Sequence, residues 1–76
     1  MELIFENQSK LDWVIPALNY KIQIALNILK ANDIEIPNGK CKAVINHLLK
    51  AEFYFEDVPN TFQNQFQNAL ENCRLL

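Results

Sequence analysis

The stretch PALNYKIQIALNILKAND, residues 16–33, constrains the fold of this chain most strongly. Its apolar residues have helical spacing, but they occupy more than one side of a helix. At about 100° per residue, the apolar positions between 13 and 31 form two adjacent stripes that cover roughly two-thirds of the circumference. An ordinary surface helix needs only one such stripe. This helix must therefore be covered on two sides or present one stripe to a partner.

The two stripes have different compositions. The first stripe contains Val14, Leu18, Ile22, Ala25 and Leu29, with Leu26 beside it. The second stripe contains Trp13, Ala17, Tyr20, Ile24 and Ile28, with Ala31 at its end and Lys21 at its edge. The second stripe holds both aromatic residues of the region, so its environment decides what this helix does.

Two explanations for the second stripe are open. In the first, the helix is the central element of a bundle, two other helices each bury one stripe, and the amino-terminal residues Leu3, Ile4 and Phe5 cover what remains. In the second, the stripe binds a protein, because Trp and Tyr are enriched among the residues that dominate binding energy at interfaces. Lys21 would then mark the boundary, with its stem on apolar atoms and its ammonium group free to pair with a partner carboxylate.

The start of this helix has two solutions. Ser9 and Asp12 stand three residues apart, as in a capping box, so we expect the helix to begin near one of them and to end at about Asn32. Proline is easily accommodated only in the first turn of a helix. Either Asp12 is the cap, or a short helix over 9–15 meets a second helix at Pro16.

Two further helices are expected downstream. After the turn signal at 37–39, apolar residues recur at spacings of three and four as far as residue 56 and predict a helix. They are Cys41, Val44, Ile45, Leu48, Ala51 and Phe55. Asn60 begins the next expected helix, which has its own stripe. That stripe is Phe62, Phe66, Ala69, Leu70 and Cys73.

The predicted fold class is therefore all-α, with residues 1–76 forming a single helical domain. It is a small three-helix bundle, or a four-helix bundle if Pro16 breaks the first helix. Because Ile34 and Ile36 alternate around a glutamate, the sequence also allows a minimal two-stranded tie between residues 3–6 and 34–36.

Length, charge and cysteine content limit the function classes. A domain of 76 residues has marginal stability without a metal, a disulfide or a partner. The net charge of −2 disfavours nucleic acid, which usually binds to a basic surface. Two cysteines, an acidic amino terminus and the lack of a long apolar run predict a soluble, cytoplasmic protein with reduced thiols.

No arrangement of residues predicts catalysis or metal binding. His47 is the only histidine, and it lies around the helix from Cys41, so the two are poorly placed to form a nucleophilic pair. Cys41 and Cys73 lack the close spacing of a zinc site and fall on apolar stripes, where we expect buried thiols. Ser9 has no glycine-rich elbow. We therefore expect no enzyme activity, no cofactor and no small-molecule substrate.

One nucleic-acid hypothesis remains open. The second and third expected helices and the turn between them can form a helix-turn-helix, in which Gln63, Asn64 and Gln67 would read bases. Lys42 and Lys50 would then contact phosphates. The acidic residues just before the third helix and the scarcity of basic residues near it argue against this hypothesis.

The sequence thus predicts a small intracellular interaction module that binds a larger protein as a regulator, an inhibitor or an immunity-type protein. Its partner-binding residues are Trp13, Ala17, Tyr20, Lys21, Ile24 and Ile28. A homo-oligomeric structural module, in which the partner is a second copy, is the main alternative. The nucleic-acid regulator is the other. This functional prediction rests on size and on the absence of chemistry, which is an indirect argument.

Overall fold

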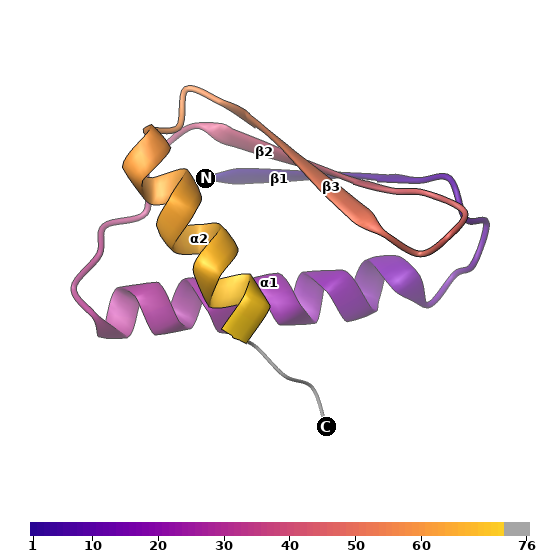
Figure 1. Ribbon diagram of the computed structural model, residues 1–76, viewed down its shortest axis with the longest axis horizontal. Helices are drawn as coiled ribbons and strands as arrows, with labels where there is room; N and C mark the ends of the chain where they lie inside the picture. Colours follow the sequence, from indigo (N-terminus) through magenta and orange to yellow (C-terminus); the bar gives the residue numbers. More distant parts are fainter. Residues whose placement is uncertain (73–76) are drawn as a thin grey trace.

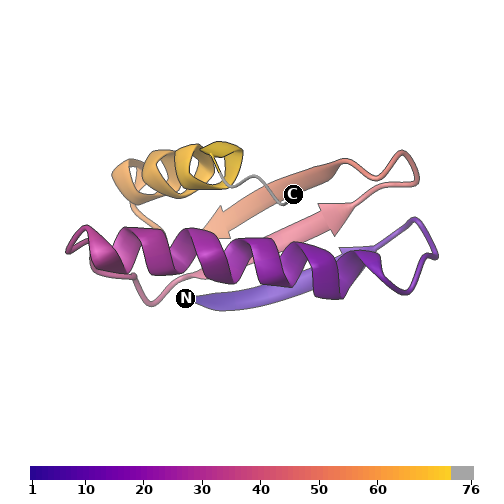
Figure 2. The ribbon, with the colours of Figure 1, turned by 90° about the horizontal axis from the view of Figure 1, so that it is seen from below.

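A computed structural model describes residues 1–72 of the chain. In chain order the elements are β1 (Glu2–Asn7), α1 (Val14–Ala31), β2 (Lys40–Ile45), β3 (Ala51–Glu56) and α2 (Asn60–Asn72). The strands form one sheet in the order β1-β2-β3, in which β1 is parallel to β2 and β3 is antiparallel to β2. Figures 1 and 2 show α1 lying along the sheet and α2 crossing it near one end. The fold is α+β.

The predicted all-α helical bundle is therefore wrong, and the error lies in residues 40–56. This segment forms the β2–β3 hairpin instead of a helix. Its apolar residues fit a helical stripe, but the buried residues Cys41, Ala43 and Ile45 also alternate with the less buried positions 40, 42 and 44. As a strand, β2 buries these three residues and leaves Lys40 and Lys42 in solvent. The aromatic residues of β3 favour a strand in the same way.

The first strand exists, but its predicted partner is wrong. Residues 34–36 form no strand, and β1 pairs instead with β2 in a register that sets Leu3 against Cys41 and Phe5 against Ala43. The α1 crossover makes this parallel pairing possible, because parallel strands need a long connection. Ile34 and Ile36 lie in the loop before β2 and pack against the core as partly buried side chains.

The long helix is intact and starts later than expected. Neither Ser9 nor Asp12 caps it; the cap position is Trp13, whose side chain makes no capping hydrogen bond. Pro16 is the third residue of α1, where its missing N–H has no helical partner to lose, so it neither breaks nor shortens the helix. The helix ends at Ala31, as predicted to within one residue. Residues 8–13 form a loop held by the Asn7 side chain, which donates to the Leu11 carbonyl at 2.8 Å.

The hydrophobic core lies between the sheet and the two helices. The first stripe of α1 faces it as predicted, with every member buried except the partly buried Leu18. The stripe of α2 is also confirmed, because Phe62, Phe66, Ala69 and Leu70 are buried, while Cys73 lies outside the described residues. Phe66 is completely buried, and the rings of Phe53 and Phe55 meet it edge-on at 6.1 and 6.0 Å. These contacts join β3 to α2 and close one end of the core.

Gly39, the residue before β2, lies in close contact with the β3–α2 connection, and no larger residue fits there without a shift of the backbone. A Cβ atom on Gly39 would lie 2.6 Å from the Asp57 carbonyl oxygen and 2.6 Å from Cγ2 of Val58, and it would also overlap the Glu56 carbonyl oxygen. The Gly39 carbonyl accepts a hydrogen bond from the Glu2 amide at 2.9 Å. Gly39 therefore lies where three segments meet: the start of β1, the start of β2 and the β3–α2 connection.

Candidate functional site

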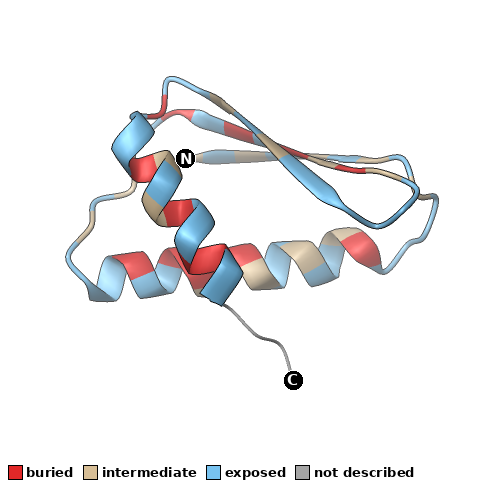
Figure 3. Cartoon of the chain, viewed as in Figure 1, coloured by how far each residue is buried: buried red, intermediate tan, exposed pale blue. Residues whose placement is uncertain are grey.

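The second stripe lies largely on the surface. Trp13 is 59% exposed, Tyr20 is 61% exposed and Ile28 is 40% exposed, while Ile24 and Lys21 are half-buried. Ala17 is exposed as well. Because residues 40–56 form a hairpin, no helix from that segment covers this side of α1, and the burial map in Figure 3 shows exposed residues along it. The explanation in which two helices bury both stripes is therefore wrong.

A groove lies beside the β2–β3 turn. It has a volume of about 590 Å³ and lies between α1, the β2–β3 turn, the start of β3 and the last turns of α2. Its apolar wall is made by Leu18, Leu49, Phe53 and Leu70. Its charged rim is made by Lys21 and Glu71. A smaller hollow of about 200 Å³ continues it towards Trp13 and Ala17, so the groove adjoins the second stripe.

The turn that joins β2 to β3 presents two leucines beside this groove. Asn46 organises the turn, because its side-chain oxygen accepts hydrogen bonds from the amides of Leu48 at 2.9 Å and Lys50 at 3.1 Å. Leu49 has a φ of +63°, a left-handed conformation that costs an L-residue roughly 1–2 kcal/mol. Leu48 is 69% exposed, the highest value for a large hydrophobic residue within 1–72. Sequence reasoning missed this turn, although Asn46, a residue type that favours turns, was a visible signal of it.

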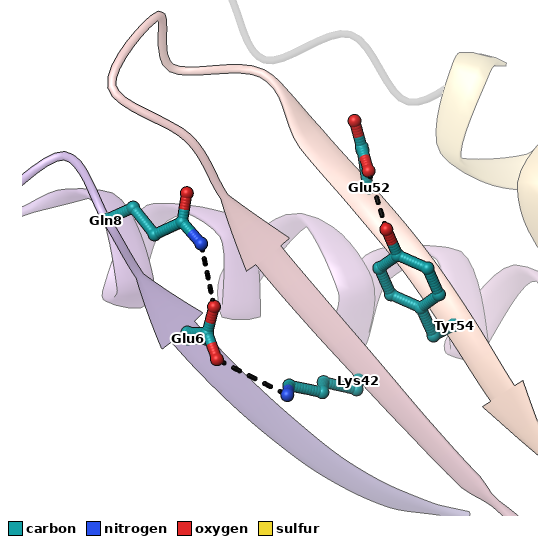
Figure 4. Close-up of polar contacts among 5 residues, drawn as sticks. All are labelled: Glu6, Gln8, Lys42, Glu52 and Tyr54. Atoms are coloured by element: carbon teal, nitrogen blue, oxygen red, sulfur yellow. Dashed lines mark hydrogen bonds and ion pairs between the residues drawn. The ribbon is translucent and has the colours of Figure 1, made fainter.

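The sheet face opposite the helices is polar. On it, the Lys42 ammonium group lies 3.3 Å from a Glu6 carboxylate oxygen, and Gln8 donates to the other Glu6 oxygen at 2.8 Å (Figure 4). The Gln8 hydrogen bond and then Lys42 lower the pKa of Glu6. The Tyr54 hydroxyl donates to Glu52 at 2.7 Å, and this hydrogen bond raises the pKa of Tyr54. These neighbouring side chains satisfy one another and leave no reactive group.

The structure does not bring the suggested nucleic-acid residues together. The helix over 40–56 that a helix-turn-helix requires is replaced by the hairpin, so that hypothesis is dropped. Gln63, Asn64 and Gln67 lie on α2, and the Gln63 side chain donates to the Val58 carbonyl at 2.9 Å. Lys42 lies on the polar face of β2, and Lys50 lies in the β2–β3 turn.

The nucleophilic and metal-ligating side chains are scattered. Cys41 is buried as predicted, and burial raises the pKa of its thiol to about 11, so the thiol is protonated at neutral pH. His47 is exposed in the β2–β3 turn, and Ser9 lies in the loop before α1. Within residues 1–72, no three His, Cys, Asp or Glu side chains are close enough to hold a metal ion.

Two surfaces therefore stand out in the described part of the chain: the second stripe of α1, and the groove beside the β2–β3 turn. Neither α1 nor α2 is long and apolar enough to cross a lipid bilayer. Comparisons with protein-family models, with curated proteins and with solved structures find no match to this chain.

Proposed function

We propose that this chain is a non-enzymatic protein-binding module whose docking surface is the second stripe. One observation carries the proposal: an apolar stripe with two aromatic residues runs the length of an 18-residue helix and stays largely outside the core. Such a helix is about 27 Å long, which is enough to span a substantial interface. Trp13 and Tyr20 would be the anchors, because large aromatic side chains bury much apolar area at a low entropic cost.

The charges beside the stripe define the chemistry of the partner. Residues 14–31 contain no Asp or Glu, and their two charged side chains are Lys21 and Lys30. No ion pair is formed by Lys21 within the described residues. The surface that fits the stripe is therefore a protein surface with an apolar centre and flanking carboxylates, because opposite charges across an interface set its register.

The role we propose is that of a small cytoplasmic regulator or inhibitor, which acts by occupying a surface of a larger protein. The small size of the chain supports this role. The scarcity of cysteine supports the compartment. A second copy of the chain offers no carboxylate along its own α1, so pairing of two second stripes would leave both Lys21 side chains unmatched.

Selection from a displayed peptide library tests the proposal without a known partner. The immobilised protein is the bait, and each enriched peptide is measured by fluorescence anisotropy against matched variants. Tyr20→Asp and Ile28→Asp should weaken peptide binding by about tenfold or more, because they place a charge in the stripe. Asn19→Asp adds the same charge to the same helix outside the stripe and should bind normally.

The enriched peptides should also combine apolar residues with Asp or Glu. Circular dichroism of each variant checks that the fold is retained. The proposal fails if no peptide is enriched, or if folded Tyr20→Asp and Ile28→Asp bind the enriched peptides as tightly as the unmodified chain does.

A further inference from the structure

We propose that the groove is a self-association site, in which Leu48 of each chain enters the groove of a second copy to form a two-fold dimer. This inference goes beyond the proposed function, because it concerns the groove and the β2–β3 turn, which share only Lys21 with the second stripe.

The β2–β3 turn holds Leu48 in an exposed and ordered position. Leu48 is the large hydrophobic residue with the greatest exposure within 1–72, so its burial would remove unfavourable apolar contact with water. The turn beneath it is held by two hydrogen bonds to the Asn46 side chain and by an Asn46 amide to Lys50 carbonyl bond of 3.0 Å. An anchor that is already ordered loses little conformational entropy on binding.

The groove offers an apolar receptor for this side chain. Leu18, Phe53 and Leu70 line it from α1, β3 and α2 respectively, so its shape is fixed by three elements of the fold. Phe53 is held against the fully buried Phe66, which makes this wall part of the core. A leucine placed there would extend the core across the interface.

One pair of opposite charges can join the turn of one copy to the groove of another. Lys50 follows Leu48 by two residues, and Glu71 lies on the rim of the groove together with Lys21. Lys50 and Glu71 form no ion pair within the described part of the chain. A contact between Lys50 of one copy and Glu71 of the other would fix the register of the two chains.

The position of the turn favours a closed dimer. Leu49 belongs to the turn and also lines the groove, so the anchor and its receptor lie side by side in one chain. A two-fold axis beside the turn then lets each Leu48 enter the groove of the other copy. Such an isologous contact uses the same surface on both chains and stops at two subunits, unlike a head-to-tail contact.

Molar mass measured by light scattering tests the dimer in the full chain between about 10 µM and about 1 mM. The mass should rise with concentration from 8.9 kDa towards twice that value. Leu48→Asp should remain monomeric over the whole range. Leu11→Asp is the matched control, because Leu11 is an exposed leucine in a different loop, and this variant should dimerise normally.

A charge exchange tests the register independently. Glu71→Lys and Lys50→Glu should each weaken dimerisation by about tenfold, and the double variant should restore it, because the attraction is recreated with reversed signs. Circular dichroism confirms that each variant is folded. A wild-type mass of 8.9 kDa at all concentrations overturns the inference, as does a dimer that Leu48→Asp leaves intact or a double variant that fails to recover.

The two proposals fail separately. A monomeric chain that still binds selected peptides through Tyr20 would refute the dimer and leave the proposed function standing. A dimer that is lost in Tyr20→Asp and kept in Leu48→Asp would instead mean that second stripes pair with each other, which also refutes the groove site.

Discussion

The two faces of the sheet are made by the same three strands and have opposite chemistry. Towards the helices, Cys41, Ala43 and Ile45 of β2 are buried. On the other face, Lys42 lies level with Ile4 on one side and Tyr54 on the other, in contact with solvent. Each strand therefore serves two tasks at alternate residues. The helix-facing side supplies the free energy of folding, and the polar side contributes mainly pairwise contacts that salt can screen.

The largest difference in stability should appear between two variants that each lose one aromatic ring. Phe66 of α2 lies on the helix side of the sheet, and Tyr54 of β3 lies on the polar side. Phe66→Ala empties the centre of the aromatic cluster on the helix side and should cost about 3–5 kcal/mol, which is comparable to the total stability of a domain of this size. We therefore expect Phe66→Ala to be largely unfolded at 25 °C by circular dichroism. Tyr54→Ala removes an exposed ring from the polar face and should unfold near the wild-type urea midpoint. Equal losses would contradict the contrast.

The second-largest effect should come from Gly39, the residue before β2, which lies against the backbone of residues 56 and 57. Gly39→Ala forces a methyl group against the carbonyl oxygens of Glu56 and Asp57, which are backbone atoms and cannot rotate away. We expect a loss of about 3 kcal/mol, at the upper end of overpacking effects. Urea unfolding measures it, and Asn38→Ala at the adjacent exposed position is the control. A stable Gly39→Ala would show that this junction can relax.

The third effect is the pH dependence of stability that the buried thiol of Cys41 produces. Its folded-state pKa of about 11 lies above the ordinary value of 9.0, so the folded chain holds the thiol proton more tightly than the unfolded chain. The resulting stability is fully present below pH 9 and is lost as the pH rises towards 11, by about 2–3 kcal/mol in total. Urea titrations at a series of pH values give the free energy of unfolding of wild type and of Cys41→Ala, and the difference between the two pH profiles is the contribution of the thiol. Parallel pH profiles above 9 would contradict it.

The smallest effect should come from the ion pair on the polar face. Lys42→Ala removes the partner of Glu6, but both groups are about half-exposed, and exposed ion pairs contribute little. We expect a slight loss of stability that disappears in about 1 M salt, where charges are screened within about 3 Å. Because the pKa of Glu6 is lowered, the contribution is present at neutral pH and fades as the pH falls through that lowered value. A salt-independent loss would indicate a packing role for the Lys42 stem.

Sequence reasoning identified both helices and their buried stripes because a helix with four or five apolar residues at helical spacing has few alternative folds. It failed at residues 40–56 because Cys41, Ile45 and Phe55 fit both the helical spacing of three and four and the strand alternation of two. The alternation in KCKAVI and AEFYFE was the better guide, since Val, Ile, Phe and Tyr favour strands. The parallel pairing of β1 with β2 had no local signal, because it joins residues far apart in the chain.

The two candidate surfaces also differ in how far they could be predicted from the sequence. The second stripe was visible in the sequence, since its composition and spacing are local properties of one helix. The groove was not, because Leu18, Phe53 and Leu70 come from three elements whose packing depends on the hairpin. The exposure of Leu48 was also hidden, because a helical reading placed it on a buried stripe.

The parallel pairing of β1 and β2 has a consequence for synthesis on the ribosome. Every β1–β2 pair joins residues 38 positions apart, from Glu2 with Lys40 to Asn7 with Ile45, whereas β2 and β3 are joined by a short turn. The first strand to emerge must therefore wait, with Leu3 and Phe5 uncovered, until the middle of the chain has been made. Glu2 and Glu6 stand on either side of these residues, and charged side chains on an unpaired strand disfavour its pairing with another chain.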